Sequence, residues 1–351
     1  MTKLFRTFLL LALAGLAFLP SLSLGAGKAE VRPAEMKAAD LVTDGQPIDL
    51  ASPRYVELFE ELRGKHGFSQ EELLRLFAGV TIRKRVLELM DTQWEAKPYY
   101  LYWPRFITPQ VVEEGRRQRV RHAALLEAVE KKFGVERDIV LAIWGIESRF
   151  GKSTGSFNLF QTLNTMFDAY PRRRAFYRTQ LVAFVLLCRE NGVDPQSITG
   201  SYGGAFGQTQ FIPSSFQAYA VDFDGDNKRD VWQSVPDVLA SIANYLHNFG
   251  WVLGAPIYRE LGEDLKGEAL TAAFQKGRKG LVPWQQVGKI QGLTMPPSPG
   301  DRDLTIVGLE LADGGMRYVA AYPNLQAITK WNNSNRYAMA VAELAERLRG
   351  R

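Results

Sequence analysis

The sequence predicts a mainly α (α+β) protein that contains a small antiparallel β insertion near its C-terminus. Two observations predict the helices: apolar residues recur at helical spacing over most of residues 69–250, and the periodic segments are bounded by capping and breaking residues. A third observation predicts the insertion, because residues 252–325 change to Gly and Pro punctuation around strand-forming runs. No internal repeat is visible.

The composition limits the class of protein. The 351 residues are 46% hydrophobic and 23% charged, which is ample for a core and excludes a disordered chain. This length exceeds a typical domain of about 100–150 residues, so two or three packed subdomains are expected. A formal net charge of +5 is too weak a field to indicate a nucleic-acid partner. The single cysteine, Cys188, excludes a disulfide scaffold and a multi-cysteine zinc site.

The first 25 residues predict a secretory signal peptide. Two basic residues precede an apolar run from Phe8 to Leu19, and small residues follow, so cleavage is expected near Gly25 or Ala26. The alternative is a membrane anchor, but the run is shorter than the ~20 residues that a spanning helix needs. We therefore expect an exported chain with no stable membrane insertion after cleavage.

The remaining elements are predicted in order from capping signals, apolar periodicity and turn residues. Helices are expected from the capping box of Ser69 and Glu72, over Val80–Trp94, from Thr108-Pro109 to Gly134 after an aromatic connector at 97–107, over 136–150, from Pro171 to Glu190, at short turns after Asp194 and Pro213, over Ser234–Asn248, and over Tyr337–Leu348. Strands are expected over Leu304–Leu311 and Met316–Tyr322, joined by the turn Asp313-Gly314-Gly315.

A glutamate near the end of the predicted helix at 136–150 is the candidate catalytic acid. Glu147 follows a run of apolar residues, so its carboxyl is expected to lose hydration near the negative end of a helix, and both effects raise its pKa. A carboxyl that stays protonated near neutrality is what cleavage of a glycosidic bond requires of its acid. The alternative is a structural Glu paired with Arg149 or another arginine.

The segment Ser201–Ser214 is too rich in glycine for a regular helix or strand. Glycine lets the backbone approach a ligand closely, and the amide of Gln210 can exchange hydrogen bonds with sugar hydroxyls. No Gly-Lys-Ser/Thr element follows, so the segment is not a phosphate-binding loop. The alternative is an ordinary buried turn.

A third motif predicts a calcium site. Asp222, Asp224 and Asp226 occupy the first, third and fifth positions of an EF-hand-like loop, and Lys228 is placed to offer its backbone carbonyl. Three clustered carboxylates repel one another without a metal ion, so calcium is favoured over a solvated turn.

This loop departs from the EF-hand pattern at two positions. Asn227 replaces the usual glycine at position six but still tolerates a left-handed backbone. Gln233 stands at position twelve, where it cannot chelate bidentately, so Asp237 at the start of the next helix is the candidate closing ligand of a longer loop.

Together these motifs resemble the lytic murein transglycosylase B family from about Phe133 to Leu348. The matching segments are Gly-Ile-Glu-Ser-Arg-Phe-Gly around Glu147, Gly-Ala-Phe-Gly-Gln-Thr-Gln-Phe-Ile-Pro-Ser-Ser, the acidic loop ending in Asp230-Val231-Trp232, Ala243-Asn244-Tyr245-Leu246, and Trp331-Asn332-Asn333-Ser334 with Tyr337-Ala338-Met339-Ala340-Val341. The resemblance implies a lysozyme-like core with a calcium-binding loop. It also implies cleavage of the MurNAc–GlcNAc β-1,4 bond of peptidoglycan without water, leaving a 1,6-anhydro-MurNAc end.

The resemblance assigns roles to individual residues, with Glu147 as the single catalytic acid and base. The implied substrate-binding residues are Ser201, Gln210, Phe211, Tyr245, Asn332 and Tyr337, and the implied metal ligands are Asp222, Asp224, Asp226, Lys228 and Asp237. Trp331 stands where the family often has Tyr, and His122 falls roughly where another groove Tyr is common, so the aromatic wall departs from the family pattern.

The implied organisation has six parts. These are a signal peptide (1–25), a polar arm (26–52), a helical region (53–132), a lysozyme-like catalytic core (133–251) with its EF-hand-like loop (222–237), a small β subdomain (252–325), and a C-terminal helix that completes the core (326–351). The expected partner is the glycan strand of peptidoglycan in the periplasm, with structural Ca²⁺ and no cofactor for catalysis. The alternatives are a hydrolytic muramidase and a non-catalytic peptidoglycan-binding scaffold.

Overall fold

The computed structural model describes residues 37–91 and 97–350, which belong to one compact unit beginning at Lys37. The predicted signal peptide and the first part of the predicted arm lie outside the described residues. Within the described ranges, no helix combines the length and the apolar character needed to cross a membrane.

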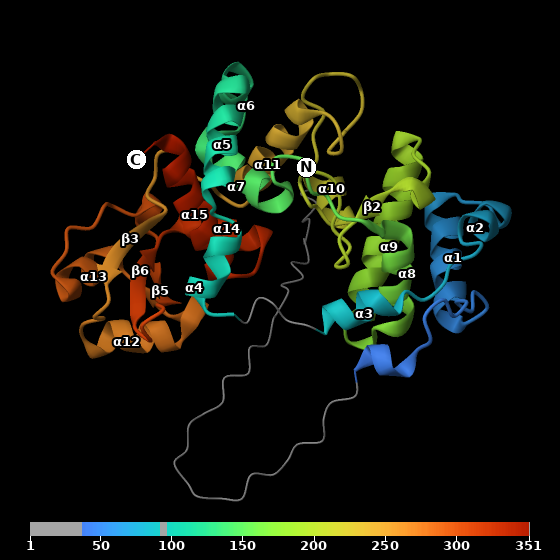
Figure 1. Cartoon of the computed structure of the whole chain (residues 1–351), viewed down its shortest axis with the longest axis horizontal. Coiled ribbons are helices and arrows are strands. Elements are labelled where there is room, and N and C mark those ends of the chain that lie inside the picture. Colours follow the sequence, from blue (N-terminus) through green and yellow to red (C-terminus); the bar gives the residue numbers. More distant parts are fainter. Residues whose placement is uncertain (1–36, 92–96, 351) are drawn as a thin grey trace, which may run out of the picture. The chain divides into compact units, whose positions relative to one another are not determined.

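The mainly α fold class is confirmed, with short antiparallel sheets (Figure 1). The α-helices are α1 (Pro53–His66), α2 (Gln70–Leu76), α3 (Lys84–Met90), α4 (Tyr99–Tyr102), α5 (Pro109–Arg121), α6 (Ala123–Phe133), α7 (Arg137–Ser148), α8 (Leu159–Ala169), α9 (Arg174–Asn191), α10 (Pro213–Tyr219), α11 (Val235–Asn248), α12 (Glu268–Gln275), α13 (Trp284–Gln291), α14 (Pro323–Trp331) and α15 (Asn335–Arg349). Short 3₁₀ turns are η1 (Ala38–Leu41), η3 (Trp103–Arg105), η4 (Pro171–Arg173), η5 (Pro195–Ser197), η6 (Gly277–Lys279) and η7 (Pro299–Asp301). The strands are β1 (Phe157–Asn158), β2 (Thr199–Gly200), β3 (Tyr258–Gly262), β4 (Leu281–Val282), β5 (Leu304–Glu310) and β6 (Met316–Ala321).

The N-terminal helices confirm one predicted start and correct another. The Ser69 side chain accepts from the Glu72 backbone while the Glu72 carboxylate accepts from Ser69, so the predicted capping box forms at α2. The start of the helix predicted over Val80–Trp94 is wrong, because α3 begins only at Lys84; the predicted end at Trp94 lies outside the described residues. Residues 80–83 do not join this helix, because the backbones of Val80 and Ile82 exchange hydrogen bonds with residues 45–48.

The helix predicted from Thr108 to Gly134 is in fact two helices. Thr108 caps the start and Gly134 ends the pair in a left-handed conformation, as predicted. The helix is interrupted at His122, whose backbone is not helical (φ −110°, ψ 25°). The break lets α5 pack on α7 and α15 while α6 packs on α7 and α11, which one straight helix could not do.

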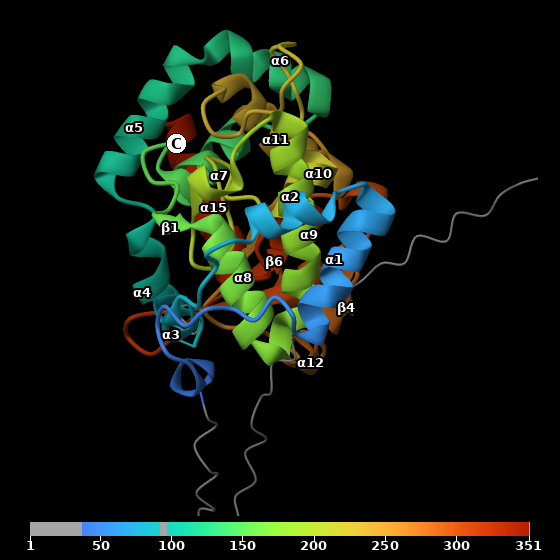
Figure 2. The same cartoon turned by 90° about the vertical axis from the view of Figure 1, so that its right-hand side faces the viewer.

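The helix predicted over 136–150, which carries the apolar run before Glu147, is confirmed at the centre of the core. Helix α7 packs against α5, α6, α11 and α15, and nine of its residues are buried. Figures 1 and 2 show α7 among these helices. Because α7 is covered over most of its circumference, the position of its C-terminal end is fixed by packing.

Two buried helices were missed by the sequence analysis, and one of them carries site residues. Helix α8 is capped by Asn158, whose side chain accepts from the backbone N–H of Gln161. Helix α14 begins at Pro323, a residue that favours the first turn of a helix. Both segments are short and buried, and short apolar runs do not distinguish helices from strands by periodicity alone.

The β insertion forms a four-stranded antiparallel sheet in the order β3-β6-β5-β4. The predicted hairpin is confirmed, because β5 and β6 pair from Thr305↔Ala321 to Glu310↔Met316 around a turn in which Gly314 has a φ of +88°. Helices α12 and α13, which were not predicted, pack here with a small separate group of buried residues. The boundaries of the predicted subdomain at 252–325 stay a prediction.

Candidate active site

Glu147 is the penultimate residue of α7, and an unusual turn follows it. Arg149 and Phe150 both adopt left-handed backbones, with φ values of +50° and +58°. The buried Ser148 holds this turn, because its Oγ accepts from Gly151 and its carbonyl accepts from Ser153. Such strain in residues other than glycine is sustained only where the surrounding structure enforces it, and it clusters at functional sites.

Two side chains from the C-terminal part of the chain donate to the same oxygen of Glu147. The Tyr337 hydroxyl lies 2.5 Å from Oε1 and the Trp331 indole nitrogen lies 2.9 Å from it. The other oxygen, Oε2, has no hydrogen-bond partner among the described residues. Since the Glu147 side chain is partly exposed, Oε2 is the atom left to meet a ligand.

Burial raises the pKa of Glu147 to about 7, and the hydrogen bonds from Tyr337 and Trp331 oppose this rise. The ion pair with Arg149 that was the structural alternative does not form. Arg149 instead donates to the backbone carbonyl of Arg105 at 3.2 Å. The site therefore holds a carboxyl that exchanges its proton near neutral pH.

Trp331 is held in place by two buried aromatic side chains. Its ring centroid lies 5.0 Å from that of Phe211 and 4.7 Å from that of Tyr245. Tyr245 also donates to the carbonyl of Lys330 at 2.5 Å. Phe211 and Tyr245 are nearly fully buried whereas Trp331 is partly exposed, so Trp331 offers the open surface of this aromatic wall.

In the glycine-rich segment, the two predicted contact residues Gln210 and Ser201 already use part of their hydrogen-bonding capacity within the protein. The Gln210 amide nitrogen donates to the carbonyls of Thr154 and Gly207, which leaves its Oε1 as an acceptor. The Ser201 hydroxyl oxygen accepts from Ala205, which leaves its hydrogen to donate. Gln210 itself has a left-handed backbone, with a φ of +49°.

Gln208 is a residue that the sequence analysis missed. Its side chain accepts from the Trp144 indole at 2.9 Å and donates to the Trp232 carbonyl at 2.8 Å. It thereby ties the glycine-rich segment both to α7, which carries Glu147, and to the acidic loop. A Cβ at Gly151 would stand 2.4 Å from the Gln208 amide oxygen, so only glycine fits there. Nothing in the local sequence distinguishes Gln208 from Gln210.

The remaining predicted residues differ in where they lie. Asn332 follows Trp331 directly, caps the end of α14 and is partly exposed. His122 does not hydrogen-bond to Glu147; its ring lies edge-on to Trp144, with centroids 6.0 Å apart. The role of Trp331 as a direct donor to Glu147 has no signal in the sequence, where Trp331 is visible only as a departure from the family pattern.

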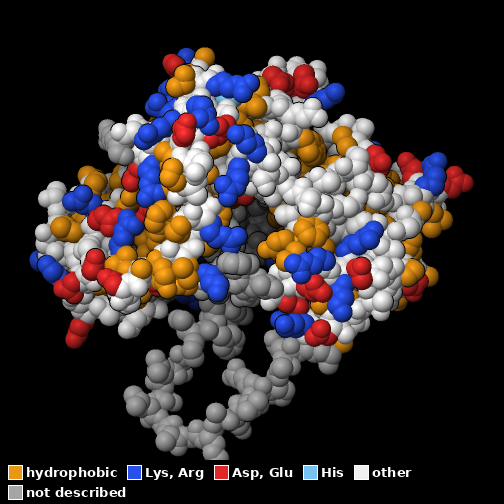
Figure 3. Space-filling view, viewed as in Figure 1, with side chains coloured by type: hydrophobic (Ala, Val, Ile, Leu, Met, Phe, Trp, Pro, Cys, Tyr) orange, Lys and Arg blue, Asp and Glu red, His pale blue; other side chains and the backbone are white. Residues whose placement is uncertain are grey.

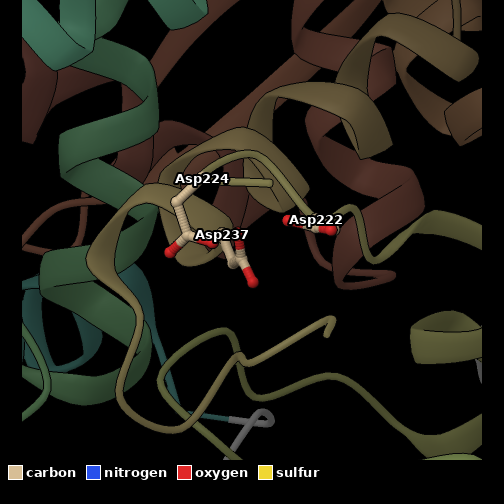
Figure 4. A group of neighbouring side chains, drawn as sticks. All are labelled: Asp222, Asp224 and Asp237. Carbon is tan, nitrogen blue, oxygen red and sulfur yellow. The ribbon is translucent and has the colours of Figure 1, made fainter. Parts of the chain in front are cut away.

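The acidic loop brings together three of the predicted ligands. Carboxylate oxygens of Asp222, Asp224 and Asp237 all lie within 4.8 Å of one another. Figure 4 shows the side chains of Asp224 and Asp237 next to each other, with Asp222 to one side. The carboxylate of Asp226 is not part of this group and accepts instead from the backbone of Lys228.

The donor set of this group fits a hard cation such as calcium. No Lys or Arg of the described chain forms an ion pair with Asp222, Asp224 or Asp237. Asp237 is fully buried, and desolvation raises its pKa even though it accepts hydrogen bonds from the backbone of Phe223 and Asp230. Oxygen ligands with uncompensated negative charge are those that calcium prefers.

Comparisons with known proteins cover all of these segments. The family model for the Transglycosylase SLT domain matches residues 51–346. The curated Membrane-bound lytic murein transglycosylase B of Escherichia coli (strain K12) is 30% identical over 310 residues, which cover 84% of this chain and 82% of that protein. The solved structure of Escherichia coli lytic transglycosylase Slt35 in complex with calcium has a TM-score of 0.74 at 30% identity, covering 88% of this chain and 96% of that one. Pseudomonas aeruginosa SltB3 in complex with NAG-anhNAM-pentapeptide has a TM-score of 0.72 at 32% identity, covering 85% of this chain and 79% of that one.

Proposed function

This chain belongs to the family of proteins with a transglycosylase SLT domain, and we propose that Glu147 serves as both acid and base in its reaction. The protein is a lytic transglycosylase, a lyase that acts on the glycan strands of peptidoglycan. The observation that carries the proposal is one partly exposed carboxyl, with a pKa of about 7, whose Oε2 is left open to a ligand.

The reaction proceeds in two proton transfers through this carboxyl. Protonated Glu147 gives its proton to the oxygen of the departing GlcNAc as the bond to C1 of MurNAc breaks. The ionised Glu147 then takes the proton of the MurNAc C6 hydroxyl as that oxygen bonds to C1. Because the attacking hydroxyl belongs to the same sugar, proximity replaces an activated water, and the product is a 1,6-anhydro end.

Tyr337 and Trp331 support both transfers. Their hydrogen bonds to Oε1 stabilise the carboxylate that remains after the first transfer, while burial keeps the pKa high enough for the acid form to be populated. An acid that must also act as base works best with a pKa near the working pH. We also propose that Gln210, Ser201 and Asn332 exchange hydrogen bonds with the sugars; the Gln210 amide oxygen and the Ser201 hydroxyl hydrogen, which the internal bonds leave available, support this.

The partners of Glu147 support this reaction over hydrolysis. Retaining and inverting hydrolases normally use a second carboxylate about 5–10 Å from the first. Among the described residues, the side chains that bond to Glu147 are Tyr337 and Trp331, and neither supplies a second carboxylate. Mass spectrometry of digested sacculi tests the proposal, because anhydro ends lack one water relative to hydrolysed ends; products with only hydrated reducing ends would contradict it.

Replacing Tyr337 by Phe tests the proposed protonation directly. Without the Tyr337 hydrogen bond, the carboxylate form is less stable, so the pKa of Glu147 rises above its present value of about 7. Activity that needs protonated Glu147 falls as the pH rises through this pKa. The basic limb of the kcat/KM profile should therefore move upward by about 1 pH unit. Tyr245→Phe is the matched control, since its hydroxyl bonds to Lys330 instead, and its limb should stay in place. A limb that does not move in Tyr337→Phe would contradict the proposal.

We further propose that Asp222, Asp224 and Asp237 hold a calcium ion, with Asp226 and the carbonyl of Lys228 completing its ligands. The close approach of three unpaired carboxylates supports this proposal, as does the relative solved in complex with calcium. A bound calcium ion would neutralise their charge and brace the loop. The loop supports the site through Val231 and Trp232, whose carbonyls accept from the backbone and side chain of Gln208.

The location of the protein is also a proposal. The related Escherichia coli protein is described as membrane-bound. For this chain we propose export to the periplasm with cleavage near Gly25 or Ala26, supported by the basic, apolar and small-residue order of its first residues. N-terminal sequencing of the exported protein should begin at one of these positions, and an intact N-terminus on a membrane-bound protein would contradict the proposal.

A further inference from the structure

A small cavity lies next to the segment that supplies both hydrogen-bond donors to Glu147. It has a volume of about 160 Å³ and is lined by residues of η6, β5, β6, α14 and the start of α15. Lys330 lines it and directly precedes Trp331, and Asn335 lines it two residues before Tyr337. Helix α14 and strand β6 are in contact, and Figure 1 shows α14, β5 and α15 in this region. The cavity therefore joins the β insertion to the edge of the active site.

The polar lining of this cavity offers cations and hydrogen-bond donors but no carboxylate. Its polar residues, all within the described ranges, are Arg278, Thr305, Gln326, Thr329, Lys330 and Asn335. Neither Arg278 nor Lys330 forms an ion pair with a carboxylate of the described chain. Arg278 and Lys330 are both exposed to solvent, and partial desolvation lowers the pKa of the Arg278 guanidinium. A pocket with this lining favours a negatively charged ligand.

One donor in this lining has no partner. The amide nitrogen of Gln326 is buried, and no acceptor in the described part of the chain receives a hydrogen bond from it. Buried donors are almost always satisfied, so an orphaned one indicates a missing acceptor. Gln326 is one of the residues that line the cavity, so this unsatisfied donor belongs to its wall.

Arg278 has one bond that suggests a purely structural role. Its Nη1 donates to Oδ1 of Asn333 in the loop between α14 and α15, so the residue ties η6 to that loop. This bond uses one of the five N–H donors of a guanidinium, and the others stay available. A structural tie and a ligand-binding role are therefore compatible, and the experiment must separate them.

We propose that the cavity binds a carboxylate of the peptide that peptidoglycan carries on MurNAc. The proposal rests on the proposed function, which brings MurNAc to Glu147, the residue that Trp331 contacts. A planar carboxylate matches the donors available, because its two oxygens accept from a guanidinium fork and an amide together. The related SltB3 was solved with NAG-anhNAM-pentapeptide, so a ligand of this family carries such a peptide. An extended pentapeptide spans at most about 17 Å, ample to reach from Trp331 to a cavity whose lining includes the adjacent Lys330.

The test measures binding without cleavage, using calorimetry on the full-length Glu147→Gln protein. The ligands are a GlcNAc–MurNAc disaccharide carrying a pentapeptide, the same compound with its carboxylates amidated, and the disaccharide without peptide. We expect the peptide to tighten binding about 10-fold and amidation to remove that gain. Adding Arg278→Ala should weaken the pentapeptide ligand about 10-fold more than the bare disaccharide.

Lys279→Ala is the matched control for the lost charge. Lys279 is an exposed residue of the same turn and does not line the cavity, so its loss should leave the ratio of the two affinities unchanged. An equal loss on both ligands in Arg278→Ala would show that Arg278 acts only as a structural tie, and would overturn the proposal. So would an Arg278→Ala protein with unchanged affinities.

A second variant keeps the shape of the cavity. Gln326→Glu is nearly isosteric and places a negative charge where we propose that a carboxylate binds, so at pH 8 it should weaken the pentapeptide ligand by at least the same factor. Unchanged binding would contradict the proposal. These measurements need no turnover; a wild-type protein that forms no anhydro ends would refute the proposed reaction while leaving the peptide site to be judged on affinity alone.

Discussion

Replacing Glu147 by Gln is expected to reduce glycan cleavage by at least about 10³-fold while the protein stays folded. General acid–base catalysis contributes about 10²–10⁴-fold for one role, and here a single residue performs both. The Gln amide oxygen can still accept from Tyr337 and Trp331, so the contacts that hold this end of α7 are retained. The release of anhydro-MurNAc ends from sacculi, followed by mass spectrometry, measures the loss.

The matched control is Glu127→Gln, which makes the same chemical change at an exposed position of α6. It should cleave sacculi at the wild-type rate. A Glu147→Gln protein that keeps more than a tenth of wild-type turnover would show that another group supplies the proton, and the assignment of Glu147 would be wrong.

The same substitution should also stabilise the fold, and only at high pH. The folded pKa of Glu147, about 7, lies above the ordinary value of 4.5, so the folded state holds this proton more tightly than the unfolded state does. Wild-type stability therefore falls as the pH rises from about 4.5 to 7, by at most about 3 kcal/mol. Glu147→Gln removes this cost, so urea unfolding should find the variant more stable than wild type at pH 8 and equal to it at pH 4. A difference that does not change with pH would contradict the raised pKa.

Removing calcium is expected to lower the stability of the protein, and to lower it more than it lowers the rate of glycan cleavage. Calcium held at 100 times its Kd stabilises the folded state by about 2.7 kcal/mol, which corresponds to a fall in Tm of roughly 5 °C on chelation. The physical reason is that Asp222, Asp224 and Asp237 repel one another once the ion is gone. Calorimetric scans with excess calcium and with a chelator measure the shift.

The Asp224→Asn variant distinguishes the stabilising effect of the metal ion from that of the hydrogen bonds within the loop. The variant keeps an oxygen for Ser234, which hydrogen-bonds to this carboxylate, but removes one of the three charges. Its Tm should no longer respond to calcium, and under chelation it should be at least as stable as the wild type. Asp313→Asn, in the β5–β6 turn, is the control and should keep the full calcium response. A wild-type Tm that chelation leaves unchanged would refute the site.

The sequence predicted the elements whose signals are local. The capping box at Ser69, the stop at Gly134 and the Asp313–Gly315 turn each depend on residues a few positions apart, and each formed as expected. The errors have a different physical cause. Residues 80–83 were predicted to be helical, but they pair with residues 45–48. The helix predicted through His122 is interrupted there, so that its two halves pack on different helices. Tertiary contacts there outweigh local propensity.

The candidate site likewise combines features that the sequence predicts with features that only the tertiary structure shows. The sequence by itself determined that Glu147 ends a buried helix, that a glycine-rich segment and an acidic loop accompany it, and which family these motifs resemble. Only the tertiary structure decided what surrounds the carboxyl. Trp331 and Tyr337 lie 184 and 190 residues further along the chain, and the packing of α15 and α11 on α7, with α14 on both of these helices, brings them to one oxygen. A pKa depends on burial and on neighbours within a few ångströms, and separation along the sequence does not reveal those distances.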